Sequence, residues 1–245
     1  MIIPSELNRL DRFVLSRFQR EFITIDLLIF PESNRRDYFL SLIKNHSAYD
    51  TIIIPNTNNN ICRLEVEYNS KVIIGHVGAL GKSHNIINFL ECINSLDDDN
   101  IEYWFVGYVE QDIKELIKKS TNQQIKLFNQ VKHNQLNEIY KYFDLGLILY
   151  SDVSLHFKYC APNKLYEYWS CGIPVLADKL PGLLDLNFNS KLGNLIDMSS
   201  KEEFLSAIKS IRKLPIKTRK DIQEIFRKEY MLDNFIVKLE TIING

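Results

Sequence analysis

The chain has 245 residues, of which 45% are hydrophobic and 25% are charged, and its formal net charge is −1. These values are typical of a globular protein with a sizeable core, and the absence of a basic excess disfavours a general nucleic-acid-binding protein. The N-terminus shows no signal-peptide pattern, and no apolar window reaches the roughly 18 residues of a membrane span. We therefore expect a cytoplasmic protein, with peripheral membrane contact left open.

The N-terminal third alternates between helical and strand patterns. Apolar residues recur at helical spacing over 7–18, with arginines between them, so this helix would either face the core or lie on a membrane surface. A strand is predicted at 22–30, and Glu32-Ser33-Asn34 would cap a helix that runs to about residue 44. After a short strand that begins at Thr51 and ends in a turn at Pro55-Asn56, the asparagine-rich stretch 56–60 suits either a linker or an exposed loop.

From residue 71 onward, strands and helices of about ten residues alternate. Strands are predicted at 72–77, 102–106, 125–128, 144–150, 174–177 and 194–196, and helices at 85–94, 110–119 and 135–143. This alternation predicts an α/β fold: a Rossmann-like parallel sheet with helices on both faces and ligand beyond the carboxyl ends of the strands. Ser200 and Glu203 form a capping box for a further helix.

The four cysteines carry no metal-binding pattern. Cys62, Cys92, Cys160 and Cys171 form no C-x-x-C pair and have no histidine at metal-ligand spacing. Reduced, cytosolic cysteines are the simplest interpretation, and we expect neither a metal nor a cofactor.

A glycine-containing loop follows the strand at 72–77. In Gly78-Ala-Leu-Gly-Lys82-Ser-His84, the glycines would let backbone amides approach a phosphate, which a basic side chain would neutralise. A plain turn between strand and helix explains Gly-x-x-Gly about as well, and the spacing is not that of a Walker loop. Because no G-x-G-x-x-G opens a helix, NAD binding is disfavoured.

The most informative stretch runs from Tyr159 to Asp178. Pro162 suits the start of a helix and Gly172 its end, and a buried strand follows. Lys164 and Glu167 lie on the helix between them, where a lysine near the N-terminus can meet a phosphate and a carboxylate can accept from sugar hydroxyls. The alternative is a capped helix in which Glu167 merely pairs with Lys164.

The motif Pro162-Asn163-Lys164-Leu-Tyr-Glu167-Tyr-x-x-Cys-Gly-Ile-Pro-Val resembles the signature of GT-B-fold glycosyltransferases of family 4, also called group 1. The resemblance implies a retaining, metal-independent enzyme that uses a nucleotide-diphosphate sugar as donor and a polysaccharide or glycolipid as acceptor. It makes Glu167 the residue that holds the donor ribose. The family's first glutamate falls at Tyr159, so that half of the pattern is absent.

The same resemblance implies the remaining donor contacts. Gly78 with Lys82 or His84 takes the place of the family's glycine loop, and Val131 falls where a backbone turn meets the nucleotide base. We expect the nearby His133 to cap the next helix or to lie in solvent. The implied catalytic residues are Lys164 and Glu167, and the implied donor-binding residues are Gly78, Lys82, His84, Val131, Tyr159, Pro162, Asn163, Lys164, Glu167 and Gly172.

The resemblance also divides the chain into three parts. Residues 1–66 would be a remnant of the N-terminal acceptor domain with its linker, 67–225 the nucleotide-sugar-binding domain, and 226–245 a helix that crosses back. The family's N-terminal domain is far longer than this remnant. An alternative function is therefore a non-catalytic nucleotide-sugar-binding subunit, or a truncated relic, that needs a separate acceptor-domain partner.

Overall fold

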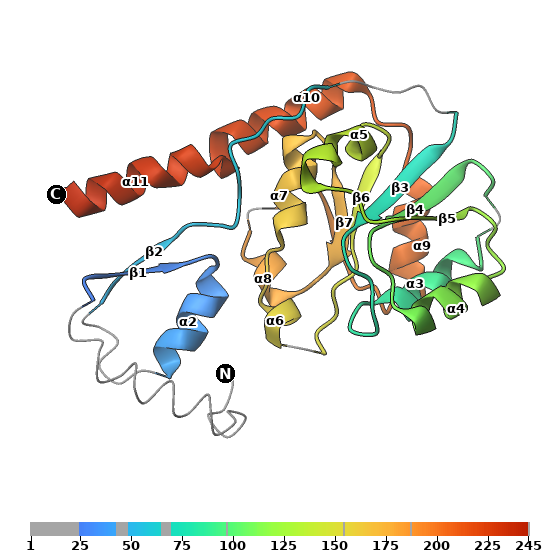
Figure 1. The fold of residues 1–245 in the computed structure, drawn as a ribbon, viewed down its shortest axis with the longest axis horizontal. Helices are drawn as coiled ribbons and strands as arrows, with labels where there is room; N and C mark the ends of the chain where they lie inside the picture. The colour runs from blue at the N-terminus through green and yellow to red at the C-terminus, as the bar shows by residue number, and fades with distance from the viewer. Residues whose placement is uncertain are drawn as a thin grey trace.

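The computed structural model describes residues 25–42, 49–64, 70–96, 98–153, 155–186 and 188–244. The helix predicted at 7–18 and the first residues of the strand predicted at 22–30 lie outside them. Within the described ranges the α/β class is confirmed, because a six-stranded parallel sheet carries helices on both faces (Figure 1). None of the helices described there is long and apolar enough to span a membrane.

The large sheet has the strand order β5-β4-β3-β6-β7-β8, and all of its pairs are parallel. Its strands are β3 (Val72–Val77), β4 (Ile101–Val106), β5 (Ile125–Phe128), β6 (Leu145–Ile148), β7 (Val175–Asp178) and β8 (Gly193–Ile196). They fall at the six predicted positions. Since the chain builds outward from β3 in one direction and then returns to its other side with β6, a crevice is expected at the carboxyl ends of these two strands.

Each face of the sheet has its own apolar core. One core is covered by α3 (Ile86–Ile93), α4 (Gln111–Lys119) and α9 (Lys201–Ser210), and the other by α5 (Asn137–Tyr140), α7 (Asn163–Ser170) and α10 (Ile216–Ile225). The helix predicted at 135–143 is shorter than expected, because a 3-10 turn at His133–Gln135 precedes α5. Half of the predicted capping box forms: Ser200 Oγ accepts from the Glu203 backbone N–H, whereas the Glu203 carboxylate bonds elsewhere.

Helix α7 lies against the sheet where two strands carry glycine. The Tyr168 hydroxyl accepts from the Val77 backbone N–H at 3.1 Å and donates to the Gly75 carbonyl at 3.3 Å. A Cβ on Gly146 would lie 2.5 Å from the Tyr168 ring. The glycine in β6 therefore makes room for the tyrosine that fixes the position of α7.

We expect Gly146→Ala to lower the free energy of unfolding by about 1–3 kcal/mol, because the added methyl group overpacks the contact with the Tyr168 ring. Urea denaturation followed by circular dichroism measures the loss. The same substitution in a Tyr168→Leu background is the control, because the ring is then gone and the methyl has space. An equal loss in both backgrounds would contradict this explanation.

A small unit precedes the large sheet. It consists of β1 (Leu27–Phe30), α2 (Ser33–Ser41) and β2 (Asp50–Ile53), with the two strands parallel. Helix α2 ends at Ser41, before the predicted end at residue 44, which lies outside the described ranges. The short helices α6 (Leu155–Lys158) and α8 (Pro181–Leu184) face this unit (Figure 1).

The residues predicted to cap α2 instead join the unit to the rest of the chain. Glu32 has no side-chain capping bond; its buried carboxylate accepts the backbone N–H of Ala161 at 3.0 Å. Ser33 and Asn34 both donate to the carboxylate of Asp185, at the end of α8. The unit is therefore tied to the loop before α7.

The C-terminal helices return toward the small unit. After α10, a π-helical turn at Phe226–Tyr230 leads into α11 (Leu232–Asn244), which extends toward β1 and β2 (Figure 1). The asparagine-rich stretch 56–60 lies beside these helices, because Thr57 donates to the Tyr230 carbonyl at 2.7 Å and Asn59 to the Asp233 carboxylate at 2.6 Å.

Candidate functional site

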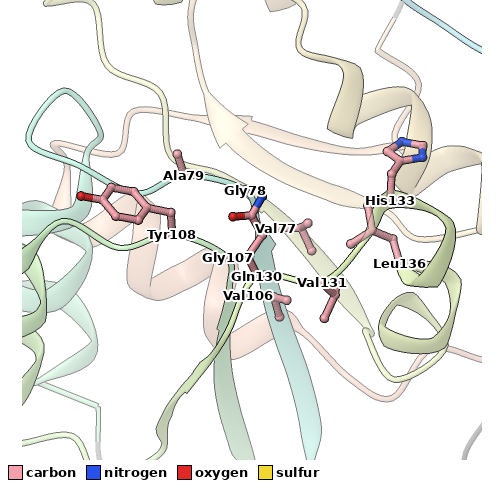
Figure 2. Close-up of a pocket in the computed structure, with 10 residues that line it drawn as sticks. All are labelled: Val77, Gly78, Ala79, Val106, Gly107, Tyr108, Gln130, Val131, His133 and Leu136. Carbon is pink, nitrogen blue, oxygen red and sulfur yellow. The ribbon is translucent and has the colours of Figure 1, made fainter.

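A cavity of about 300 Å³ opens at the carboxyl ends of β3 and β4 (Figure 2), next to the crevice that the strand order predicts between β3 and β6. It lies between the glycine loop and the segment that follows β5. Its lining residues are Val77, Gly78, Ala79, Val106, Gly107, Tyr108, Gln130, Val131, His133 and Leu136. Two of the predicted donor contacts, Gly78 and Val131, are thus brought together on one cavity.

Two glycines let the loops approach each other here. Gly78 has a φ of +118° and Gly107 a φ of +137°, a region that side chains rarely adopt. A Cβ on Gly107 would collide with the Gly78 carbonyl oxygen. A Cβ on Gly78 would lie 3.3 Å from Lys164 Nζ, so glycine at position 78 leaves space beside the ammonium.

Lys164 reaches this loop from the first turn of α7. Its Nζ lies 3.4 Å from His76 Nε2 and 5.2 Å from the centroid of the Tyr150 ring. Burial lowers the pKa of Lys164 to about 8, against the opposite effects of the Glu167 carboxylate and the Cys160 thiol. Among the residues that the structure describes, no carboxylate forms an ion pair with this ammonium. A desolvated ammonium without a counter-charge is suited to bind an anion.

Two neutral histidines stand beside the ammonium. His76 is fully buried in β3, and its Nδ1 lies 3.2 Å from the Leu147 carbonyl oxygen. His84 Nδ1 accepts from the Gly81 backbone N–H at 3.1 Å. Burial, followed by the charge of Lys164, lowers the pKa of both rings, that of His84 to about 4. Lys164 is therefore the positive charge of this cluster at pH 7.

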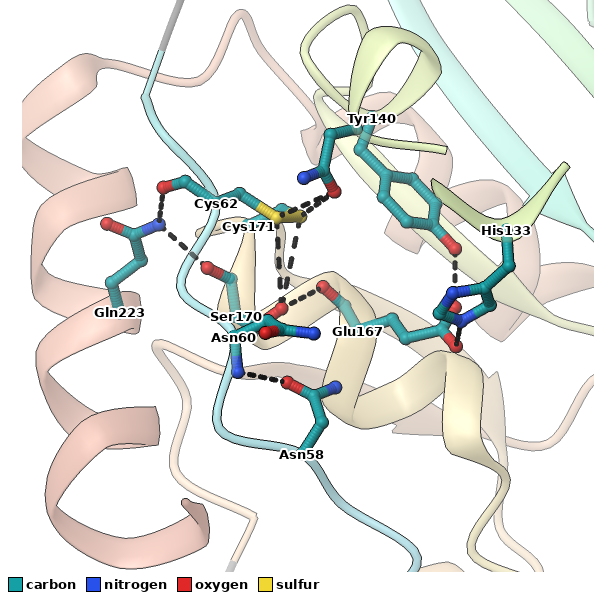
Figure 3. Close-up of a disulfide and its surroundings, with 10 residues drawn as sticks. Asn58, Asn60, Cys62, His133, Tyr140, Glu167, Ser170, Cys171 and Gln223 are labelled. Atoms are coloured by element: carbon teal, nitrogen blue, oxygen red, sulfur yellow. Dashed lines mark hydrogen bonds and ion pairs between the residues drawn. A yellow bond between two sulfur atoms is a disulfide. The ribbon is translucent and has the colours of Figure 1, made fainter. Parts of the chain in front are cut away.

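Glu167 lies one turn further along α7, and two side chains hold its carboxylate (Figure 3). The Tyr140 hydroxyl donates to Oε2 at 2.6 Å, and His133 Nε2 lies 3.1 Å from Oε1. The sequence alternative, in which Glu167 merely pairs with Lys164, is not what the structure shows, because Lys164 points to His76.

Sequence reasoning missed both partners of Glu167. His133 is 78% exposed, which agrees with the solvent-facing position expected for it, but it does not cap the 3-10 turn, because it is the first residue of that turn and Lys132 is the N-cap. In the sequence, Tyr140 is one apolar position of a predicted helix. It lies 27 residues before Glu167, whose carboxylate accepts its hydrogen bond. No local sequence pattern predicts a contact between residues so far apart in the chain.

The C-terminal end of α7 is joined to the segment between β2 and β3 by a disulfide between Cys62 and Cys171 (Figure 3). The prediction that all cysteines are reduced was wrong for this pair: their Cα atoms are 4.7 Å apart although 109 residues separate them in sequence. Gln223 donates to the carbonyls of Cys62 and Ser170 at 2.8 and 2.7 Å. Cys92 and Cys160 are buried free thiols.

The remaining predicted residues divide into two groups. Pro162 is the N-cap of α7, Asn163 its first residue, and Gly172, with a φ of +67°, follows its last turn, as the pattern predicted. Lys82 points away to the carboxylate of Asp112 on α4 and is 70% exposed. Tyr159 lies in the loop before α7 and is not part of the cavity lining.

A family model described as "Glycosyl transferases group 1" matches residues 59–229, which contain the cavity, α7 and the large sheet. No curated protein matches the chain in sequence.

Solved structures of low sequence identity share the fold. Anabaena Alr3699/HepE in complex with UDP-glucose has 14% identity and a TM-score of 0.72, over 99% of this chain and 69% of that one. A mutant of S. aureus TarM in complex with fondaparinux, α-GlcNAc-glycerol and UDP has 15% identity and a TM-score of 0.71, over 100% of this chain and 48% of that one. Sucrose-phosphate synthase from Thermosynechococcus elongatus has 16% identity and a TM-score of 0.67, over 99% of this chain and 64% of that one. The chain thus spans about half to two thirds of these proteins and has a fold similar to that of GT-B glycosyltransferases.

Proposed function

The chain belongs to the glycosyl transferases group 1 family, and from this premise we propose that it transfers a sugar from a nucleotide-diphosphate donor to a polysaccharide or glycolipid acceptor. One observation carries the proposal. Helix α7 presents the Lys164 ammonium and the Glu167 carboxylate one turn apart, and each lies beside a residue that lines the cavity, Gly78 and His133 respectively.

The chemistry of these groups fits two parts of a nucleoside diphosphate donor, the charged diphosphate and the neutral ribose. Lys164 and the N-terminus of α7 supply positive charge for the diphosphate, while Glu167 accepts hydrogen bonds from the ribose hydroxyls. The backbone at Val131 would lie against the base. When the bond between sugar and diphosphate breaks, the negative charge that develops on the leaving diphosphate is stabilised by Lys164. We propose a retaining reaction in which donor binding needs no divalent metal.

UDP is the first ligand to test, because solved structures of similar fold contain it. We expect calorimetric titration without divalent metal to show binding of UDP and UDP-glucose, with GDP and GDP-mannose in parallel to identify the base. Uridine should bind more weakly than UDP. A folded chain that binds no nucleoside diphosphate would refute the proposal.

We propose as an alternative a non-catalytic subunit that binds a nucleotide sugar and acts together with a separate acceptor-domain protein. The chain spans 48% to 69% of the compared proteins. Release of glucose from UDP-glucose, or its transfer, by the isolated chain would contradict this alternative. In either case we propose a cytoplasmic location, with peripheral membrane contact where the acceptor is a glycolipid.

A further inference from the structure

We propose that His76 is a positioning residue for Lys164: its neutral ring accepts a hydrogen bond from the ammonium and holds it beside Gly78, where the donor diphosphate binds. This inference rests on the proposed function for the identity of the anion. The contact itself belongs to the free protein and can be tested without a donor.

His76 lies at an otherwise apolar position of the sheet. It is fully buried in β3, the strand from which the sheet builds in both directions, and its neighbours in the strand are apolar or glycine. Burying an imidazole costs free energy unless both nitrogens have partners. Packing alone would be served better by an apolar ring, so the ring nitrogens need an explanation.

The two ring nitrogens of His76 have different partners. His76 Nδ1 lies 3.2 Å from the Leu147 carbonyl oxygen, which can only accept, so we assign the ring proton to Nδ1. Nε2 is then an acceptor, and Lys164 Nζ lies 3.4 Å from it. The Ala79 carbonyl lies at the same distance of 3.4 Å from Nε2 and cannot donate to it. The lysine is therefore the donor that satisfies this nitrogen.

Several other side chains face the Lys164 ammonium. The titratable groups around it come from several elements: His76 on β3, His84 in the next loop, Tyr150 after β6, Cys160 before α7 and Glu167 on α7. The Glu167 carboxylate is held by Tyr140 and His133, and Tyr150 offers its ring face. An ammonium on a four-carbon stem has many rotamers. The acceptor at His76 selects the one beside Gly78 and leaves a further N–H for the ligand.

The binding test compares His76→Phe, which keeps a ring but has no acceptor, with His76→Gln, whose amide oxygen can still accept. We expect His76→Phe to weaken UDP binding about tenfold and to leave uridine binding unchanged, while His76→Gln restores most of the loss. In a Lys164→Met background, His76→Phe should cause no further loss of UDP affinity. A loss that is additive to that of Lys164→Met, or that is equal for UDP and uridine, would overturn the proposal.

A second set of measurements needs no ligand, and its first part needs no variant. Nitrogen NMR of the free wild-type protein should show His76 as the neutral tautomer protonated at Nδ1, and protonation at Nε2 would overturn the proposal. Lysine side-chain NMR should further show that the Lys164 pKa is lower in His76→Phe than in the wild type, because an acceptor favours the ammonium. An unchanged pKa in a folded variant would count against the contact. If these results hold while wild-type protein binds no UDP, the proposed function fails and the positioning contact stands.

Discussion

Replacing Lys164 by methionine is expected to weaken UDP binding about a hundredfold at pH 7 and to leave uridine binding nearly unchanged. Methionine keeps the length of the side chain but removes its charge. Charge-assisted hydrogen bonds to phosphate in a partly desolvated site are strong, and each 1.4 kcal/mol corresponds to about a tenfold change in affinity. Calorimetric titration with both ligands measures the difference. Lys118→Met, on the exposed side of α4, is the matched control and should bind UDP like the wild type.

The pH dependence of UDP binding tests the same charge. Because the pKa of Lys164 in the free protein is about 8, UDP affinity should begin to fall between pH 7 and 8, be about halved at pH 8, and approach a tenfold fall per pH unit above it. The reason is that the lysine beside the bound diphosphate retains a proton that it loses in the free protein. The neighbouring His76 and His84 are already neutral in this range, since their pKa values are lowered. Lys164→Met should abolish the fall. A decline of the same size in this variant would contradict the assignment of the proton to Lys164.

The free protein should become more stable when this charge is removed. The pKa of Lys164 is lower in the folded chain than in the unfolded one, so the ammonium destabilises the fold at every pH below about 8, and this cost disappears as pH rises toward 10.4. We therefore expect Lys164→Met to raise the free energy of unfolding by up to about 3 kcal/mol at pH 7. Urea denaturation at pH 7 and pH 10 would show the gain at the lower pH. If Lys164→Met binds UDP weakly but is more stable than the wild type, the Lys164 charge serves ligand binding and does not stabilise the fold.

Glu167→Ala is the second substitution with a large expected effect, and it should weaken UDP binding about tenfold to a hundredfold. A hydrogen bond from a ribose hydroxyl to a carboxylate contributes roughly 1.5–3 kcal/mol. The same hydrogen bonds can be removed from the side of the ligand, with a 2′,3′-dideoxy analogue of UDP that lacks the ribose hydroxyls. The wild-type chain should prefer UDP to this analogue, and Glu167→Ala should bind the two equally. A preference that persists in Glu167→Ala would show that another group holds the ribose.

The partners of Glu167 allow a control for folding. The substitution leaves the Tyr140 hydroxyl, which donates to this carboxylate at 2.6 Å, without its acceptor, and a buried unpaired donor costs about 1–3 kcal/mol of stability. Tyr140→Phe removes that hydroxyl while the carboxylate remains. We expect the Tyr140→Phe/Glu167→Ala chain to recover stability relative to Glu167→Ala, but to bind UDP as weakly.

The order of elements could be read from the sequence, because it depends on local patterns. Alternating apolar strands and amphipathic helices placed all six strands of the large sheet and their parallel direction, and Pro162 and Gly172 marked the ends of α7. Predictions of side-chain contacts were wrong where a residue distant in the sequence takes the hydrogen bond that the local pattern predicts. Glu32 was expected to cap α2, yet its carboxylate bonds Ala161, which is 129 residues away.

The sequence by itself determined the class of fold, the glycine loop after β3 and the helix that carries Lys164 and Glu167. It did so because turn residues, helix ends and apolar spacing are properties of neighbouring residues. Only the tertiary structure decided what surrounds each functional group: His76 and Tyr150 beside the ammonium, His133 and Tyr140 on the carboxylate, and Cys62 bonded to Cys171. These contacts join separate strands and loops at the crevice of the sheet. They depend on the packing of elements that no local pattern specifies, and it is this packing that desolvates Lys164 and lowers its pKa to about 8.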